Sequence, residues 1–217
     1  MKALEAVQPK DLNASEIDVR LGSTWIDPKF IRQFMYETFH TPSYYQWEDY
    51  PFARNRNAIS VFFSAITAEW NITNKSSIHY NDVMANTTFG TSRMNAYEIL
   101  EATLNLRDVR VYDKKVGPDG KDTRVLNSRE TTLAQQKQQA IKDAFRSWIW
   151  KDPDRRDELV QVYNERFNST RPREYDGSHI SFAGMNPVIN LRPHQRNAIA
   201  HILYGGNTLL AHEVGNR

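Results

Sequence analysis

Apolar side chains recur at helical spacing from residue 30 to residue 39, directly after Asp27 and Pro28. An aspartate before a first-turn proline is typical of a helix N-terminus, because its carboxylate accepts hydrogen bonds from backbone N–H groups that the first turn leaves without partners. The pattern therefore predicts a helix that begins at Pro28. Pro42 marks the end of this helical stretch.

A second apolar stripe predicts a long helix in the C-terminal half of the chain. Asn127 or Ser128 can cap it, Glu130 is placed to complete a capping box, and the helix should run to about Trp150. The apolar face of this helix is expected to consist of Leu133, Ile141, Ala144, Phe145, Trp148 and Ile149.

Another helix should follow at once, because Asp152 and Pro153 repeat the combination of cap and first-turn proline. Two helices joined by so short a turn commonly pack against each other, so we predict an αα-hairpin. The buried stripe of its second helix is expected to be Leu159, Val160, Tyr163 and Phe167.

Alternating apolar and polar positions predict extended structure in three places. Residues 17–21 are typical of a short strand or an extended arm, and residues 59–72 of a strand pair or meander. Residues 107–127 predict a β-hairpin, because residues 117–120 form a strong turn sequence. The tip of this hairpin carries Lys114, Lys115 and Lys121.

Two further helices are predicted at residues 94–106 and from Pro193 to the glycine pair at 205–206, with a short apolar strand at residues 208–211. Together these elements predict an α+β fold in which helices accompany small antiparallel sheets and hairpins.

Composition narrows the possible functions. The 217 residues include no cysteine, which excludes disulfides, thiolate metal sites and cysteine nucleophiles, and the six histidines form no metal-binding spacing. No apolar run is long enough to cross a bilayer and no secretory signal is visible, so we expect a cytoplasmic protein without a membrane partner. Residues 101–217 hold 19 Lys and Arg against 15 Asp and Glu, a balance that permits a nucleic-acid partner.

The C-terminal residues follow the order of elements that a nucleotide-binding motor needs. Gln195 lies at the start of the last helix, a short apolar strand follows, and the chain then reaches Gly215. A glutamine amide can pair with an adenine edge, and a glycine-bearing turn after a strand can offer backbone N–H groups to phosphates. The lysine and hydroxyl residue of a P-loop do not follow, so the chain alone is expected not to hydrolyse ATP. The alternative is a glycine-terminated helix followed by a tail.

Two pairs of arginines are candidate phosphate ligands, Arg171 with Arg173 and Arg54 with Arg56. The planar guanidinium group suits bidentate contact with phosphate oxygens. The alternative is that both pairs lie in solvated or salt-bridged loops. Carboxylates beside the first pair could neutralise it.

Several stretches of the chain resemble one large bacterial family. They are RPREYDGSH at 171–179, GMNP at 184–187, LRPHQ at 191–195 and LLAHEVG at 209–215, together with the blocks 17–39 and 91–113. The family consists of very long proteins of conjugative elements and phages. These proteins combine an adenine-specific DNA methyltransferase-like domain with a superfamily-two, Swi/Snf-type helicase. The resemblance covers nearly the whole chain.

The resemblance implies roles for a few residues at the C-terminal end. Gln195 matches the adenine-reading glutamine of the helicase, and the opening of its P-loop is matched by His212, Glu213, Val214 and Gly215. In the family a Gly-Lys-Thr sequence follows, whereas this chain departs at Asn216, so we expect a fragment that binds no cofactor itself. ATP and Mg²⁺ would bind only in the intact parent protein. The methyltransferase signature is absent, so any S-adenosylmethionine site would lie elsewhere in the parent.

This interpretation divides the chain into an α+β accessory domain at residues 1–170, a linker or surface loop at 171–190, and the N-terminal fragment of a helicase ATPase domain at 191–217. The predicted function is a non-catalytic domain that connects modules or contacts DNA ahead of the motor. Its partners would be DNA and the other domains of the same parent chain. The alternative is a stand-alone protein-interaction domain without a nucleic-acid role.

Overall fold

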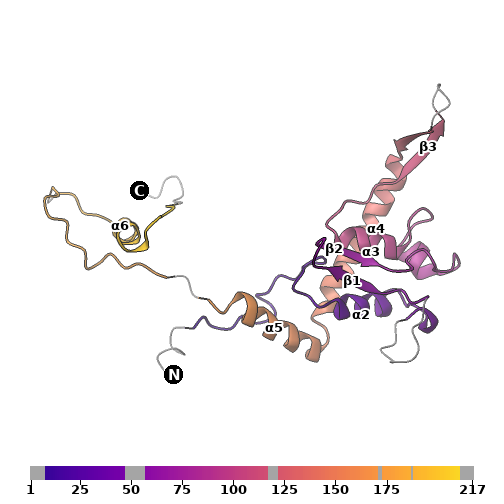
Figure 1. Ribbon diagram of the computed structural model, residues 1–217, viewed down its shortest axis with the longest axis horizontal. Helices are drawn as coiled ribbons and strands as arrows, with labels where there is room; N and C mark the ends of the chain where they lie inside the picture. Colours follow the sequence, from indigo (N-terminus) through magenta and orange to yellow (C-terminus); the bar gives the residue numbers. More distant parts are fainter. Residues whose placement is uncertain (1–7, 47–56, 117–121, 171–172, 187, 211–217) are drawn as a thin grey trace. The chain divides into compact units, whose positions relative to one another are not determined.

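The computed structural model describes residues 8–46, 57–116, 122–170, 173–186 and 188–210. The chain forms two compact units (Figure 1). The larger unit is Lys10–Asn168, and the smaller unit contains the residues from Ser169 onward with the first nine residues.

The larger unit confirms the predicted α+β class. Its described helices are α2 (Pro28–Thr38), α3 (Ala96–Leu104), α4 (Ser128–Ile149) and α5 (Pro153–Phe167), with a 3-10 turn, η1 (Ser43–Tyr45), and a single π-helical turn, η2 (Met84–Thr88). The four described strands form two antiparallel pairs, β1 (Val61–Ser64) with β2 (Glu69–Ile72), and β3 (Tyr112–Val116) with β4 (Asp122–Leu126).

The caps expected from the sequence set the beginnings of three helices. The Asp27 carboxylate accepts a hydrogen bond from the Lys29 N–H at 2.8 Å, and the Asp152 carboxylate accepts one from the Arg155 N–H at 2.8 Å. The side chain of Asn127, and not that of Ser128, caps α4. These bonds satisfy N–H groups that a helix cannot satisfy internally, which is why the boundaries were predictable from local sequence.

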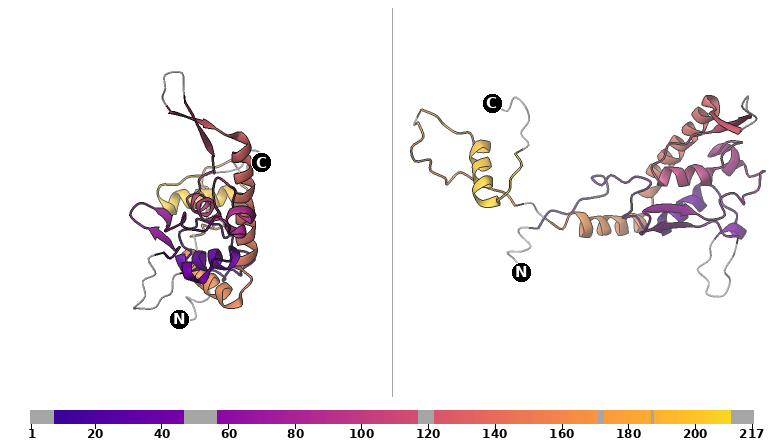
Figure 2. Two further views of the ribbon diagram at one scale, coloured as in Figure 1. Left: turned by 90° about the vertical axis from the view of Figure 1, so that its right-hand side faces the viewer. Right: turned by 45° about the horizontal axis from the view of Figure 1, so that its top comes forward.

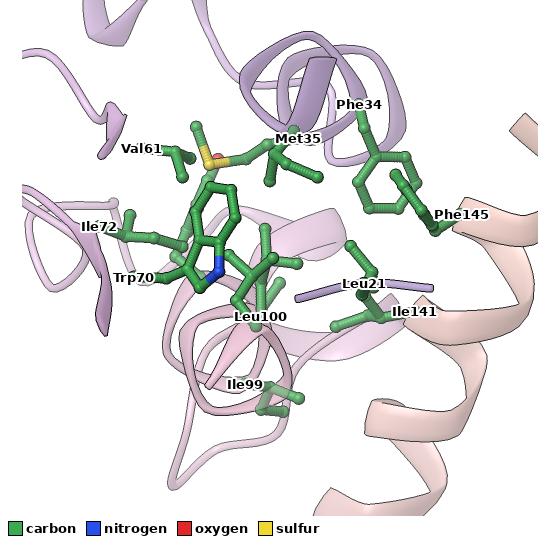
Figure 3. Packing of buried hydrophobic residues seen from close by; sticks show 14 of the residues in the cluster. Leu21, Phe34, Met35, Val61, Trp70, Ile72, Ile99, Leu100, Ile141 and Phe145 are labelled. Atoms are coloured by element: carbon green, nitrogen blue, oxygen red, sulfur yellow. The ribbon is translucent and has the colours of Figure 1, made fainter. Parts of the chain in front are cut away.

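The core lies where α2, α3, α4 and the β1–β2 pair meet (Figure 3). The Phe34 ring of α2 contacts the Phe145 ring of α4 edge to face, with centroids 5.1 Å apart. Figure 3 shows the side chains that join these elements, among them Met35, Val61, Trp70, Ile72, Leu100 and Ile141. A core built from four elements fixes the position of α4 and of everything attached to its N-terminus.

The segment 17–21 is an extended arm rather than a strand. Ile17, Val19 and Leu21 are buried, whereas Asp18 and Arg20 between them are exposed, and no strand pairs with the segment in the described structure. The alternation of apolar and polar residues therefore arises because one side of the extended arm is buried against the core and the other faces solvent.

Two details of the predicted helical faces are wrong. Leu133 is 40% exposed and Phe167 is 54% exposed. On α4 the buried positions near Leu133 are instead Ala134 and the polar Thr131 and Gln138. The side chains of these two polar residues bond the backbone of the segment that leads into β3.

The predicted αα-hairpin is also wrong, because α5 turns away from α4 instead of running back along it (Figure 1). The apolar face of α5 packs against the segment before α2, where the Tyr163 ring meets the Trp25 ring at 5.4 Å. Of the predicted stripe, Leu159 is the residue that is fully buried in the core. The position of α5 is therefore set by its contact with the segment before α2 and not by packing along α4.

The smaller unit contains one described helix, α6 (Pro193–Gly205), which Gly206 follows with a φ of 78°. The described residues between Ser169 and Arg192 form no helix or strand. Thr208, Leu209 and Leu210 belong to no strand, so the strand predicted at 208–211 is not present in its described part. None of the described helices of either unit is long and apolar enough to cross a membrane.

Candidate nucleic-acid interface

The hairpin of β3 and β4 stands out from the rest of the larger unit (Figures 1 and 2). Its register pairs Tyr112 with Leu126, Lys114 with Arg124, and Val116 with Asp122. Every residue of β4 is exposed, and so are four of the five residues of β3. Two strands with solvent on both faces bury too little apolar surface to be held by packing, so the hairpin depends on its base for its position.

Hydrogen bonds to α4 hold the base of the hairpin. Val111 donates its N–H to Thr131 Oγ1 at 3.0 Å and accepts a hydrogen bond from the Asn127 N–H at 2.9 Å. Two turns further along α4, Gln138 Nε2 donates to the Arg107 carbonyl at 2.8 Å. The strand that enters the hairpin is therefore fastened along the first half of α4, and β4 leads through Asn127 directly into the helix.

Asp113 is the point at which three segments meet. Its carboxylate pairs with Arg93 Nη1 at 2.9 Å and accepts a hydrogen bond from Asn127 Nδ2 at 2.8 Å. The hydrogen bond from Arg93, followed by the one from Asn127, lowers the pKa of Asp113 below its ordinary value. Arg93 also donates to the Tyr112 carbonyl at 3.0 Å. The carboxylate of β3 is thus already paired at the base of the hairpin.

Two cations face each other across the hairpin. Lys114 and Arg124 are directly opposed in the register, and side chains at such positions lie about 4.5–5.5 Å apart at their Cβ atoms. Among the described residues neither side chain pairs with a carboxylate. The Arg124 guanidinium lies 5.8 Å from the centre of the Tyr112 ring, on the same face. Like charges in direct opposition destabilise a hairpin, and an anion between them would remove this repulsion.

Further cations surround this pair. Lys115 lies on the opposite face of the hairpin, and Arg110 and Arg129 are exposed near its base. The arrangement offers guanidinium and ammonium donors on a projecting element, which is the chemistry that binds phosphate groups of nucleic acids. In the part of the chain that the structure describes, no group of three or more acidic or histidine side chains gathers as a metal site would require.

Most of the site residues expected from the sequence lie outside the described residues. They are Arg54, Arg56, Arg171, His212, Glu213, Val214 and Gly215. Arg173 is described, and its guanidinium lies 5.1 Å from the ring centre of Tyr175. Gln195 is exposed and accepts a hydrogen bond from the Arg192 N–H at 2.9 Å, so its side chain caps α6 in this structure.

Sequence reasoning placed Lys114 and Lys115 near the tip of a hairpin but missed the opposition of Lys114 and Arg124. The signal that could have found it is the register, since a turn predicted from the sequence at 117–120 implies which residues face each other. The ion pair between Arg93 and Asp113 left no local signal, because it joins positions 20 residues apart.

A family model described as a domain of unknown function, DUF8437, matches residues 20–169. The chain belongs to this family. The DUF8437 domain therefore contains the hairpin, the residues that fasten its base, and almost all of the larger unit. The helix α6 lies beyond it.

A part of the chain is also similar to Defense against restriction protein B of Escherichia phage P1. The two are 30% identical over 96 residues, which are 44% of this chain and 4% of the phage protein. The chain thus spans a small fraction of the length of this relative. No solved structure matches the chain.

Proposed function

We propose that this DUF8437 domain is a non-catalytic, DNA-contacting module of a much longer DNA-processing protein. The observation that carries the proposal is the projecting hairpin with Lys114 and Arg124 opposed and without carboxylate partners among the described residues. Phosphate neutralisation by lysine and arginine supplies most of the affinity of sequence-independent DNA binding.

The two-stranded form of the hairpin supports this proposal. A two-stranded ribbon fits the major groove of B-DNA, which is about 12 Å wide. The base is fixed to α4 through Val111 and Asn127, so little ordering would be required on binding. A preorganised cationic ribbon is suited to contact the backbone of a duplex and to position neighbouring modules on it.

The phage relative supports the DNA partner and the size of the parent. Its name assigns it to defence against restriction, and restriction is cleavage of DNA. The matched residues are only 4% of that protein, so a comparable segment exists there inside a far longer chain. We extend the proposal to the parent of this chain, with DNA and the other domains of that parent as partners, in the bacterial cytoplasm.

The larger proposal is that the parent combines methyltransferase-like and helicase modules, as the resemblance implies. Gln195 would then read adenine, and the segment from His212 to Gly215 would open a P-loop that binds ATP with Mg²⁺. S-adenosylmethionine would bind in another part of the parent. In this arrangement the DUF8437 domain contributes positioning on DNA rather than chemistry.

The test is a fluorescence anisotropy titration of the purified chain with labelled duplex DNA at several salt concentrations. The double variant Lys114→Glu/Arg124→Glu should bind about tenfold or more weakly and lower the salt slope by about 2, because each lost phosphate contact contributes about 0.9. The matched control is Lys10→Glu/Lys151→Glu, which makes the same charge change at exposed positions away from the hairpin.

Equal affinity of the two double variants would contradict the role of the hairpin. Absence of binding by the wild-type chain at low salt would contradict DNA contact altogether and favour a protein-interaction domain.

A further inference from the structure

A pocket of about 220 Å³ lies in the DUF8437 domain, apart from the exposed strands of the hairpin. Three segments form it: the extended arm around Leu21, the C-terminal end of α3, and the middle of α4. Leu21 and Phe145, two of the lining residues, are visible in Figure 3 beside Ile141. Each segment contributes residues to the buried core, among them Leu21, Leu104 and Phe145.

The floor of the pocket is apolar. Val19, Leu21 and Phe145 line it and are buried on their other sides by the core. Gln138 also lines it, but its amide is already used, because Nε2 donates to the Arg107 carbonyl at 2.8 Å. A side chain that entered the pocket would therefore gain by burying apolar surface.

The rim of the pocket is cationic. It carries Arg20, Arg107, Lys142 and Arg146 against the single carboxylate of Asp108. The three arginines pair with Asp18, Glu69 and Asp143, all at solvent-exposed positions, where such pairs contribute little and exchange readily with other partners. Lys142 pairs with no carboxylate among the residues that the structure describes.

Leu106 stands at the edge of this pocket in an unfavourable conformation. Its φ is 56° and the residue is 82% exposed. The position follows α3 and is closed by a hydrogen bond from the Arg107 N–H to the Ala102 carbonyl at 2.9 Å, so it is the helix-ending position at which glycine is usual. A leucine there strains the backbone and exposes apolar surface.

We propose that this pocket binds an acidic peptide segment that inserts one large apolar side chain between Leu106 and Phe145. The volume is below the roughly 300–1,000 Å³ typical of small-molecule sites, which favours a single anchoring side chain. The cationic rim selects carboxylates on either side of that anchor. The site is independent of the hairpin and of its proposed DNA contact.

The probe is a synthetic peptide of sequence Glu-Asp-Phe-Asp-Glu, titrated to millimolar concentration into the ¹⁵N-labelled full chain and followed by amide NMR spectra. The expected result is a saturable shift of the amides of Leu21, Leu106 and Phe145. Two control peptides, one with alanine in place of phenylalanine and one with lysines in place of the acidic residues, should leave these amides unchanged.

Variants at the rim separate binding from folding. Leu106→Gly should raise the melting temperature by about 2–4 °C, because it relieves the backbone strain, and should weaken peptide binding about fivefold or more. Leu106→Ala should weaken binding without that rise in melting temperature. Lys142→Glu should weaken binding, whereas Lys151→Glu, an equal charge change outside this pocket, should not.

Absence of amide shifts at millimolar peptide would overturn the proposal, as would Leu106 and Lys142 variants that bind like the wild type. A short duplex DNA serves as a competing ligand. If the duplex and not the peptide shifts these amides, the pocket is a phosphate site and the peptide proposal is wrong.

Discussion

Asn164 of α5 satisfies both backbone groups of Leu12, which lies 152 residues earlier in the chain. Its Oδ1 accepts a hydrogen bond from the Leu12 N–H at 2.9 Å, and its Nδ2 donates to the Leu12 carbonyl at 2.9 Å. Asn164 is buried, so a side chain that could not make these bonds would leave polar backbone groups without partners. This amide, together with that of Asn168, which donates to the Lys10 carbonyl at 2.9 Å, joins the start of the larger unit to its end.

The first prediction follows from this contact. Asn164→Leu should lower the free energy of unfolding by about 1–3 kcal/mol, the cost of unsatisfied buried groups. Urea denaturation measures the change. Gln161→Leu on the same helix is the control, because Gln161 is exposed and should change the stability by at most about 0.5 kcal/mol. Equal effects of the two substitutions would show that the contact with Leu12 contributes nothing.

A pH dependence is predicted for Asp113. Its pKa is lowered in the folded state by Arg93 and Asn127, so the carboxylate stabilises the fold above its ordinary pKa of 3.8. This contribution is lost as the pH falls below that value, because the group becomes protonated. Asp113→Asn should therefore melt at a lower temperature than the wild type at neutral pH, and the difference should vanish well below pH 3.8. A difference that persists in acid would contradict the ionic character of this contact.

An opposite pH dependence is predicted for Tyr97. Burial raises the pKa of its phenol far above the ordinary 10.0, and the hydroxyl is hydrogen-bonded to Thr41 Oγ1 at 2.8 Å. The neutral phenol is compatible with the fold below pH 10.0, and stability is lost above that value because the unfolded chain can ionise. Tyr97→Phe should cost about 1 kcal/mol at neutral pH but lose less stability in alkali. Urea denaturation at neutral and alkaline pH compares the two proteins.

Arg155 connects α5 to the end of α4. Its Nε donates to the Ile149 carbonyl at 3.0 Å, its Nη2 donates to the Trp148 carbonyl at 2.7 Å, and its guanidinium lies 3.5 Å from the Trp148 ring. A lysine can neither donate in this forked geometry nor stack as a plane, so Arg155→Lys should cost about 1–3 kcal/mol. Arg156→Lys, at the neighbouring and more exposed position, should have little effect in the same denaturation experiment.

The features that the sequence predicted are those with local causes. The caps Asp27, Asn127 and Asp152 act within one helical turn, and the pairing of β3 with β4 joins residues close in the sequence. The predictions that were wrong concern residues whose partners are distant in the sequence. Gln138 is buried where its amide bonds the backbone carbonyl of residue 107, and α5 packs against the segment before α2 and not along α4.

The candidate interface was partly predictable for the same reason. The lysines near the tip follow from the hairpin itself, whereas the Arg93 contact that fixes the base joins a loop to a strand 20 residues later. The left-handed backbone at Leu106 could not be predicted, because leucine is not typical of that conformation.

The junction between β4 and α4 at Asn127 has a mechanical consequence. This residue ends the hairpin, caps α4, and contacts Asp113, so the hairpin cannot pivot without breaking the first turn of the helix. A load applied to the strands would pass into a rod of 22 residues, about 33 Å long, whose far end is stacked on Arg155. A movement of the hairpin at the N-terminus of α4 should therefore be accompanied by a movement of the C-terminal end of α4, so this helix can transmit displacement in addition to its part in the core.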